Sequence, residues 1–468
     1  MDKMENLKLK AFENNITGKR IAVIGLGVSN LPLLDYLHQL TGNVTVFEQK
    51  DLEKIDPETV QKVKDYGFEL ITGRNALHFL RGFNIIFRSP SCLPTTLQLV
   101  SEQKRGAIVT SEIEMLMHTC PCKIIGVTGS DGKTTTTNLI YEILKQGGYR
   151  CHLGGNLGIP LFTKVKDFEE DDIVILELSS FQLMGMEISP DIAVITNVSP
   201  NHLDKHKSYE EYIEAKKNIF AYQDESGKVV LNYDNDITRE CAKEADGKVV
   251  FFSSKSKLAD GIIYDDGIIK ECDDGIRKHL LDVKDIPLRG VHNYENICAA
   301  IAATSELVDS ETQIQAIKNF KGVEHRLELV RELDGVKWYN DSIGTSPTRT
   351  IAGLNSFREK IVLIAGGYDK NLDYTPLVKP ILKKVSKLIL MGATGPKIES
   401  AIIKETADSK IVFPIYRVGN IEQAVKRAKA IAKKGEIVLF SPASASFDMF
   451  KNFEERGEVF KRLVNDLK

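Results

Sequence analysis

Short apolar runs alternate along the chain with segments in which apolar residues return every three or four positions. The runs form three groups: "RIAVIGLG", "NVTVFEQ" and "FNIIFRSP"; then "KIIGVTGSDGKT", "DDIVILELSS", "DIAVITNVSP" and "KVVLNYD"; then "KIVLIAGGYDK", "KLILMGA" and "EIVLFSPASAS". Strands that alternate with helices are typical of α/β folds with parallel sheets. The pattern predicts three α/β segments, at 1–115, 116–323 and 324–468, the second with an additional β-rich polar stretch, "GIIYDDGIIKEC".

Composition and charge narrow the class of protein. The 468 residues are 42% hydrophobic and 27% charged, with a net charge of −3 and no long block of one sign. This balance excludes a basic surface for nucleic acid, and no apolar run approaches the roughly 18 residues of a membrane span. The opening segment, "MDKMENLKLKAFENNITGKR", lacks the apolar core of a signal peptide. We therefore expect a cytoplasmic protein that binds neither nucleic acid nor membranes.

Cysteine usage points to the same compartment. Seven cysteines, an odd number in a long chain, indicate free thiols in a reducing environment. Cys120 and Cys122 have no second pair at zinc-ligand spacing. We expect these two thiols to be buried or inert rather than metal ligands.

A glycine-rich stretch, "GVTGSDGKTTTTN", follows one apolar run and precedes a helical segment. Backbone N–H groups of such a loop close around phosphate oxygens, and the next helix adds its positive N-terminal end. Lys133 would reach the β- and γ-phosphates, and the Thr134 hydroxyl would bind Mg²⁺. Val127 stands where the strict P-loop pattern needs glycine, which weakens a GTPase or kinase interpretation. The alternative is a structural turn with an incidental lysine, and we favour ATP binding.

Polar residues also end two later strands of the same segment. One apolar run leads into Glu177 and another into Asn197, with His202 shortly after. Because ligands of open parallel sheets bind at the carboxyl ends of strands, Glu177 and His202 are predicted to face the phosphate loop. For each residue taken alone, a solvated strand end is the alternative.

One lysine falls on an apolar helix face. "SYEEYIEAKKNIF" begins with Ser208 and Glu211 at capping-box spacing, which predicts a helix. At 100° per residue Lys216 shares its side with tyrosines and isoleucines, whereas Lys217 lies about 100° away. A bare ammonium there is unfavourable unless it is paired or modified, and a lysine that extends to solvent is the alternative.

Taken together, these motifs resemble the Mur ligase family over essentially the whole chain. The phosphate loop, "ELSSFQL", "TNVSPNHLDKH", "EAKKNIF", "GVHNYEN" and "EHRLE" appear in the family's order. "GLGVSN", "AGGYDKN" and "SPASASFDMFKNFEERGEVF" resemble the branch that adds D-glutamate, whereas the diaminopimelate- or lysine-adding branch would carry D-N-P-R in place of "GGYDKN".

The resemblance implies a monomeric three-domain α/β enzyme of peptidoglycan synthesis. A Rossmann-like N-terminal domain, a central P-loop ATPase-like parallel-sheet domain and a C-terminal Rossmann-like domain would follow one another. ATP would phosphorylate the carboxylate of UDP-N-acetylmuramoyl-L-alanine, and the amine of D-glutamate would attack the acyl phosphate. Lys133 and two Mg²⁺ ions would stabilise the charge of the transferring group.

The family's functional residues are carried over by position. For ATP, the resemblance implies Gly129, Ser130, Asp131, Gly132, Lys133, Thr134, Thr135, Asn293, Asn296, Arg326 and Asp341. For Mg²⁺ it implies Thr134, Glu177, His202 and Lys216, the last as a carbamate derived from CO₂; Lys133, His202 and Lys216 would be catalytic. For the UDP substrate it implies Gly27, Val28, Ser29, Glu48, Gln49, Ser89 and Asn156. For D-glutamate it implies Thr345, Lys370, Ser446 and Phe447. Without the resemblance, helix capping would explain the two asparagines near residue 295 equally well.

Two departures and two alternatives stay open. Ile343 stands where many relatives have lysine, so one contact is missing or is supplied by Arg349, and Asp131 replaces a commoner asparagine. A sister ligase of the folylpolyglutamate type would share the ATP chemistry but not the "GLGVSN" domain. A nicotinamide-dependent oxidoreductase or a nucleotide-sensing module would use that first glycine loop, which has Asn30 where a dinucleotide fold prefers glycine.

Overall fold

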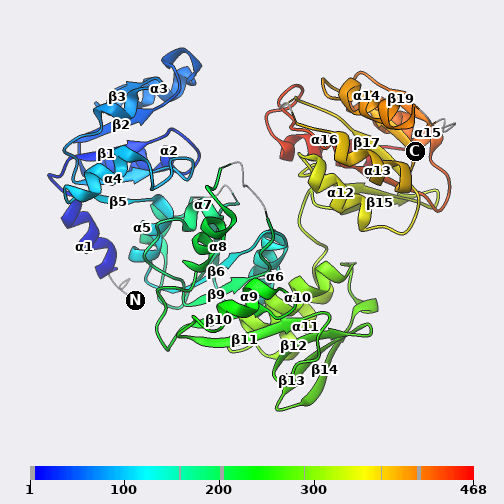
Figure 1. Ribbon diagram of the computed structural model, residues 1–468, viewed down its shortest axis with the longest axis horizontal. Coiled ribbons are helices and arrows are strands. Elements are labelled where there is room, and N and C mark those ends of the chain that lie inside the picture. The colour runs from blue at the N-terminus through cyan, green and yellow to red at the C-terminus, as the bar shows by residue number, and fades with distance from the viewer. Residues whose placement is uncertain (1–5, 158–159, 201–204, 289, 370–371, 408–412) are drawn as a thin grey trace. The chain divides into compact units, whose positions relative to one another are not determined.

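The computed structural model describes residues 6–157, 160–200, 205–288, 290–369, 372–407 and 413–468. It divides into two compact units, one of Met1–Pro287 and Val291–Phe320 and the other of Leu288–Gly290 and Lys321–Lys468. Figure 1 colours the first unit from blue to yellow-green and the second from yellow to red. Within the described residues, no helix combines the length and the apolarity that a membrane crossing needs.

The first unit begins with a five-stranded sheet in the order β3-β2-β1-β4-β5, in which every pair is parallel. Its strands are β1 (Ile21–Ile24), β2 (Val44–Glu48), β3 (Glu69–Thr72), β4 (Ile85–Arg88) and β5 (Ile108–Thr110). Its helices are α1 (Leu7–Ile16), α2 (Asn30–Leu40), η1 (Leu52–Lys54), α3 (Pro57–Asp65), η2 (Ala76–Phe79), α4 (Leu97–Lys104) and α5 (Glu112–Thr119). Strand order reverses at β1, so the crevice between the ends of β1 and β4 is the expected ligand position.

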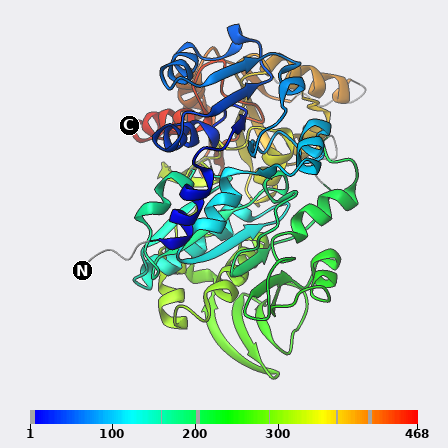
Figure 2. The ribbon, with the colours of Figure 1, turned by 90° about the vertical axis from the view of Figure 1, so that its left-hand side faces the viewer.

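A nine-stranded sheet follows in the same unit, in the order β14-β13-β12-β11-β10-β9-β6-β8-β7. Its strands are β6 (Lys123–Thr128), β7 (Cys151–Gly155), β8 (Ile173–Glu177), β9 (Ile192–Ile195), β10 (Lys228–Asn232), β11 (Lys248–Ser253), β12 (Gly261–Asp265), β13 (Ile268–Asp273) and β14 (Ile276–Asp282). Its helices are α6 (Lys133–Gln146), η3 (Phe162–Asp167), α7 (Ser180–Leu183), α8 (Tyr209–Lys217), α9 (Asp236–Cys241), η4 (Val283–Asp285), α10 (Val291–Thr304) and α11 (Ser310–Asn319). Only β12, β13 and β14 pair antiparallel among these strands, and Figure 2 shows their hairpins at the far end of the sheet.

The second unit holds a six-stranded sheet in the order β15-β16-β20-β17-β18-β19. Its strands are β15 (Glu328–Leu333), β16 (Val336–Asn340), β17 (Ile361–Ala365), β18 (Val385–Leu390), β19 (Ile415–Arg417) and β20 (Ile437–Phe440). Its helices are α12 (Pro347–Asn355), α13 (Thr375–Lys384), α14 (Gly395–Thr406), α15 (Ile421–Ile431) and α16 (Phe453–Asn465). Two apolar clusters that share no member, one with Leu363 and Leu388 and one with Val362 and Ile389, take alternate residues of the same strands. Helices therefore cover both faces of this sheet.

The three α/β sheets confirm the predicted fold class. Every apolar run named above forms a strand, and the polar stretch forms the antiparallel β12 and β13. The pattern missed the strands β3, β5, β7, β14, β15, β16 and β19, which are short or contain polar residues. Core residues from both sheets of the first unit, such as Val23 and Leu176, belong to one apolar cluster. The predicted domain boundaries stay predictions.

The helix that carries Lys216 is shorter than its apolar pattern implies. Ser208 caps α8 by accepting from the Glu211 N–H at 3.2 Å, but Glu211 returns its bond to the Lys207 N–H instead of completing a capping box. The helix ends at Lys217, and Ile219 and Phe220 lie in the following turn, buried all the same. Burial past a helix end follows from tertiary packing rather than from helical period.

Candidate active site

The glycine-rich loop joins β6 to α6, as the sequence predicts. Gly129 and Gly132 have φ of 151° and 81°, which favour glycine. A Cβ on Gly129 would lie 1.9 Å from Thr196 Oγ1, and one on Gly132 would lie 2.3 Å from Asn296 Oδ1. Both positions therefore need glycine for backbone shape and for packing. The loop leads into the N-terminus of a 14-residue helix, whose dipole and free N–H groups favour an anion.

Lys133 opens α6 and turns back over the loop. Its Nζ donates to the carbonyls of Gly129 at 2.8 Å and Ser130 at 3.1 Å. The side chain is half-buried at the edge of the loop. An ammonium held there lies where phosphate oxygens would meet the loop amides.

Residues at the end of β9 and on α8 fix the loop from the other side. Asn197 Oδ1 accepts from the Asp131 N–H at 3.0 Å, and Thr196 Oγ1 donates to the Asp131 carbonyl at 2.5 Å. Tyr212 Oη lies 2.9 Å from Ser130 Oγ, with either oxygen as donor. The sequence marked Asn197 as a polar strand end and Tyr212 as part of an apolar face, but it gave neither a role at the loop. Two sequence features could have indicated these roles: Asn197 is polar at the end of a strand, and Tyr212 carries a hydroxyl on an inward helix face.

Glu177, at the end of β8, faces the loop as predicted. One carboxylate oxygen accepts from Thr134 Oγ1 at 2.6 Å, and the other accepts from Asn156 Nδ2 at 2.7 Å. Glu177 is buried, with 3% of its surface exposed. A carboxylate and a hydroxyl in contact are the oxygen donors that Mg²⁺ prefers, so these residues fit that ion. Asn156, predicted for the UDP substrate, thus also orients the carboxylate.

Lys216 points inward, as its helical position predicts. Only 2% of its surface is exposed, and its Nζ donates to the Gly129 carbonyl at 2.9 Å and contacts Thr128 Oγ1 at 3.4 Å. The ammonium also lies 4.6 Å from the centre of the Tyr212 ring. Burial, and then the positive charge of Lys133, hold the pKa of Lys216 well below its usual value. Such an amine loses its proton more readily than an exposed lysine.

The nearby carboxylates shift the pKa of Lys216 in the opposite direction. Asp131 and Glu177 raise the pKa of Lys216, although less than burial and Lys133 lower it. Asp131 itself is exposed, so its charge stays solvated beside the two lysines.

The two predicted adenine-contacting residues lie on α10. Asn296 Oδ1 accepts from Thr136 Oγ1 at 3.3 Å, and its Nδ2 donates to Asn293 Oδ1 at 3.4 Å. Asn296 lies inside the helix, buried against Gly132, so helix capping does not explain it. Thr135 is buried behind the loop. The structure therefore brings this predicted group together with the phosphate loop, whereas His202 lies outside the described residues.

Six of the seven predicted UDP residues lie at the carboxyl ends of β1, β2 and β4, and the seventh, Asn156, follows β7. A cavity of about 120 Å³ is lined by Val28, Ser29, Pro90, Glu112, Gly155, Asn156, Pro160 and Gln182. Ser89 Oγ lies 2.9 Å from where a Cβ on Gly25 would stand, and Glu48 Oε2 accepts from the Leu26 N–H at 3.0 Å. Gly27 and Gln49 are exposed beside them. Asn30 is buried and donates to the Ile24 and Gly25 carbonyls, so it braces the loop in place of a third glycine.

Glu112 is a cavity residue that the sequence did not single out. It is 5% exposed, and one of its oxygens accepts from the N–H groups of Leu161 and Phe162 at 3.1 and 2.9 Å. Burial raises the pKa of Glu112 to about 7. A carboxyl group with that pKa is partly protonated at neutral pH and can donate a hydrogen bond into the cavity.

In the second unit, Asp341 follows β16 and is buried. Its carboxylate accepts from Ser441 Oγ at 2.6 Å and from the Leu327 N–H at 3.3 Å. Burial raises the pKa of Asp341 to about 6, although the Ser441 hydrogen bond and the charge of Arg326 act against this. Arg326 and Asp341, both predicted at the nucleotide, are therefore neighbours in this unit.

The predicted D-glutamate residues follow three adjacent strands of this sheet, β16, β20 and β17. Thr345 is half-buried and Ser446 is buried, whereas Phe447 is 59% exposed and lies edge-on to Tyr368. Lys370 lies outside the described residues. Ends of neighbouring parallel strands share one edge of a sheet, which is where ligands of such sheets bind.

A fully buried arginine, Arg456, connects the loops that carry these residues. Its Nε and Nη2 donate to Ser342 Oγ and the Ser342 carbonyl at 3.0 and 2.8 Å. Its Nη1 donates to the carbonyls of Ser444 and Ala445 at 3.0 and 2.9 Å. Burial lowers the pKa of Arg456 to about 10. The sequence pattern assigned no role to Arg456, because an arginine among the charges of "NFEERGEVF" looks like an exposed helix residue.

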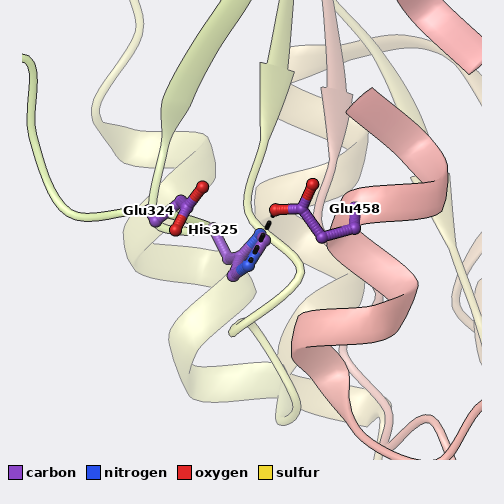
Figure 3. A group of neighbouring side chains, drawn as sticks. All are labelled: Glu324, His325 and Glu458. Atoms are coloured by element: carbon purple, nitrogen blue, oxygen red, sulfur yellow. Dashed lines mark ion pairs between the residues drawn. The ribbon is translucent and has the colours of Figure 1, made fainter. Parts of the chain in front are cut away.

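Glu324, His325 and Glu458 form a compact group at the start of the second unit (Figure 3). Their potential ligand atoms lie within 4.8 Å of one another. Lys461 Nζ already lies 2.5 Å from Glu324 and 2.7 Å from Glu458, and these contacts balance the carboxylates. His325 Nδ1 lies 3.0 Å from Asn340 Nδ2. These ion pairs connect the "EHRLE" and "EERGEVF" segments, and the group is not a metal centre.

Family comparisons agree with this arrangement. The Mur ligase middle domain matches residues 127–304, and the Mur ligase glutamate ligase domain matches residues 325–444. The chain belongs to the Mur ligase family.

Particular relatives are similar over the full length. UDP-N-acetylmuramoylalanine--D-glutamate ligase of Acetivibrio thermocellus is 50% identical over 464 residues, which are 99% of this chain and 99% of that protein. The protein of the same name from Clostridium acetobutylicum is 47% identical over 98% of both chains.

Solved structures show the same fold at lower identity. UDP-N-acetylmuramate-alanine ligase MurC from Thermotoga maritima superposes with a TM-score of 0.57 at 17% identity and covers 96% of this chain and 100% of its own. MurF ligase from the same organism, in complex with ADP, has a TM-score of 0.56 at 20% identity over 90% of this chain and 95% of its own. At these identities the likeness establishes the fold alone.

Proposed function

We propose that this protein is an ATP-dependent ligase that joins D-glutamate to UDP-N-acetylmuramoyl-L-alanine through an acyl phosphate, in cytoplasmic peptidoglycan precursor synthesis. The proposal rests most on one observation: a phosphate loop whose Thr134 hydroxyl is bonded to the buried Glu177, with Lys133 and Lys216 beside it. The full-length identity to ligases of that name supports the same conclusion. The protein would act as a monomer on small-molecule substrates.

The residues at the phosphate loop would have separate roles in binding ATP and Mg²⁺. Loop amides and Lys133 would hold the phosphates of ATP, and Asn293 and Asn296 would contact its adenine. Thr134 and Glu177 would bind one Mg²⁺, and His202 with a carbamylated Lys216 would bind a second. Bound Mg²⁺ would neutralise negative charge as the γ-phosphate is transferred. Arg326 and Asp341 would also contact the nucleotide.

Substrate recognition would use the other strand ends. Ser29, Ser89 and Asn156 would bind the UDP-linked substrate, with Gly27, Val28, Glu48 and Gln49 around them. Thr345, Lys370, Ser446 and Phe447 would receive D-glutamate. A carboxylate is a poor acyl donor, and its phosphorylation supplies a leaving group that the amine of D-glutamate can displace.

Phosphate release from ATP tests the assignment. With UDP-N-acetylmuramoyl-L-alanine, D-glutamate should support turnover, whereas D-alanine, meso-diaminopimelate and L-lysine should remain near background. A site built around paired polar groups rejects ligands that lack the partner by about 10⁴-fold. Robust turnover with one of the other three amino acids would contradict the proposed substrate and indicate another branch of the family.

The carbamate on Lys216 has its own test. Lys216→Ala should sharply lower turnover but keep nucleotide binding, and acetate should restore part of the activity by occupying the vacated space. Lys217→Ala is the matched control, because Lys217 lies on the same helix but pairs with Glu214 and Glu244 at the surface. A carbamate signal in the ¹³C spectrum with labelled bicarbonate, absent from the alanine variant, is the readout that does not depend on activity. An unmodified lysine in the active, Mg²⁺-loaded enzyme would overturn the assignment.

A further inference from the structure

Two cysteines meet where the helix α5 ends and the strand β6 begins. Cys120 is the residue that caps the C-terminus of α5, Pro121 follows, and Cys122 precedes the first residue of β6. The two sulfur atoms lie 3.4 Å apart, and the Cys120 Sγ also lies 3.5 Å from the Cys122 carbonyl oxygen. Both side chains are buried, with 2% and 7% of their surfaces exposed.

This contact is specific to one pair among the seven cysteines. All seven cysteines are free thiols. For the part of the chain that the structure describes, no second contact between two cysteine sulfurs is recorded. The sequence-based expectation of buried thiols is confirmed for Cys120 and Cys122, but their mutual contact makes them chemically different from isolated thiols.

The two sulfur atoms are in contact but not bonded. A bond between the sulfurs has a length of about 2.05 Å, so the atoms need to approach by only about 1.3 Å. With one residue between the cysteines, the approach requires side-chain rotation and a small adjustment at Pro121. A ring of that size is strained, and strained disulfides are the readily reduced ones.

The two thiols are not equivalent. The hydrogen bond between the two sulfurs lowers the pKa of Cys120, and the nearby ammonium of Lys8 acts in the same direction, although burial acts against both. The same hydrogen bond, together with burial, raises the pKa of Cys122. The thiolate is the nucleophile of a thiol pair, so the lower pKa favours Cys120 as the thiol that reacts first and Cys122 as its partner in the disulfide.

We infer that Cys120 and Cys122 form a reversible dithiol site for two-electron oxidants of the peroxide class. The Cys120 thiolate attacks one peroxide oxygen, the O–O bond breaks, and the released hydroxide takes a proton to leave as water. The resulting sulfenic acid is attacked by Cys122, the S–O bond breaks, and a second water leaves with the Cys122 proton. In total, two thiols and one peroxide give one disulfide and two waters.

The helix α1 begins beside the C-terminal end of α5. Lys8 Nζ donates to the Cys120 carbonyl at 3.2 Å, and the capping Asn6 donates to the Thr119 carbonyl at 2.9 Å. Both contacts lie at the start of a ten-residue helix, and short peripheral helices open locally at low free-energy cost. We expect oxidation to be slower than that of an exposed dithiol and faster when α1 is loosened.

The test uses the reduced full-length chain and hydrogen peroxide. The intact protein should lose about 2 Da with two of its seven thiols, and dithiothreitol should restore both. Differential isotope alkylation followed by peptide mapping should place the disulfide at residues 120 and 122, a measurement that needs no variant. A disulfide at other cysteines, or retention of all seven thiols, would overturn the inference.

Matched variants separate the two roles. Cys122→Ser should stop at a sulfenic acid on Cys120 that dimedone traps, whereas Cys120→Ser should form neither the adduct nor the disulfide. Cys151→Ser removes a partly exposed thiol elsewhere and should behave like the unaltered protein. Disulfide formation that persists in Cys120→Ser, or loss of it in Cys151→Ser, would contradict the assignment.

Discussion

Lys216 in the first unit and Arg456 in the second are both buried basic side chains. Each lies near the carboxyl ends of parallel strands, but their roles differ. Lys216 has a depressed pKa and lies beside a phosphate loop and a carboxylate. Arg456 donates four hydrogen bonds to the oxygens of three neighbouring residues. A buried cation whose donors are used by the protein stabilises structure, whereas one beside an anion-binding loop is available for chemistry.

The largest effect should come from the phosphate loop itself. Lys133→Ala should leave a folded protein but lower turnover by about 10³-fold or more, because a preorganised donor to developing charge contributes that much. Phosphate release and a thermal unfolding curve measure the two properties separately. Lys145→Ala, at the other end of α6 beside the Tyr141 ring, is the control and should stay active. Near-normal turnover of the Lys133→Ala variant would show that the loop has only a structural role, like the hydrogen bonds of Arg456.

Arg456→Ala should act on stability instead. It removes the donor to the carbonyls of Ser342 and Ser444, whereas the Ala445 carbonyl still accepts from the Tyr368 N–H. Unsatisfied buried groups cost about 1–3 kcal/mol each, so we expect a loss of about 3 kcal/mol in the free energy of unfolding. Urea denaturation of the second unit's transition measures the loss. Arg462→Ala, exposed on the same helix, should change it by less than about 0.5 kcal/mol. Equal stability of the two variants would contradict the structural role.

Acid titration should distinguish the carboxyl groups of the two units. The pKa of Asp341 is raised from 3.8 to about 6 by burial, so between these values the folded state binds more protons than the unfolded state. The free energy of unfolding should therefore fall as pH rises through this window, by on the order of 3 kcal/mol. Asp341→Asn should flatten that slope, and Asp334→Asn, which is exposed, should not.

Glu112 should cause a similar pH dependence of the free energy of unfolding in the first unit. Burial raises its pKa from 4.5 to about 7, so the same sign applies at higher pH. Glu112→Gln should remove this pH dependence of the free energy of unfolding between the two pKa values. It should leave the pH dependence caused by Asp341 unchanged. Urea unfolding at a series of pH values measures both, and a slope that the variant retains would show that another group titrates.

The smallest effects should come from the helix caps that position the two cations. Ser208 accepts from the Glu211 N–H at the start of α8, and Asn452 accepts from the Glu455 N–H at the start of α16. Ser208→Ala and Asn452→Ala should each cost about 1 kcal/mol. Thermal unfolding measures this loss, and an unchanged melting temperature would show that tertiary packing alone holds the helix.

Sequence pattern predicted the parallel strands because their apolar runs are buried on both faces, and it placed Glu177 at a strand end correctly. It also predicted the inward position of Lys216, because a helix face follows from residue spacing. It missed Glu112 and Arg456, since both stand among charged residues that resemble a solvated surface. Their burial depends on packing partners more than forty residues away, such as Leu161 for Glu112 and Ser342 for Arg456.

The sequence by itself determined the α/β class, the glycine-rich loop and the family, because these depend on local period, on backbone freedom and on ordered motifs. Only the tertiary structure decided that Thr134 meets Glu177, that Asn197 holds the loop at Asp131, and that Cys120 touches Cys122. Periodicity specifies which side of an element is buried, but it does not specify which distant polar atom that side meets. Hydrogen-bond partners and perturbed pKa values therefore arise when separate strand ends are brought to one edge of a sheet.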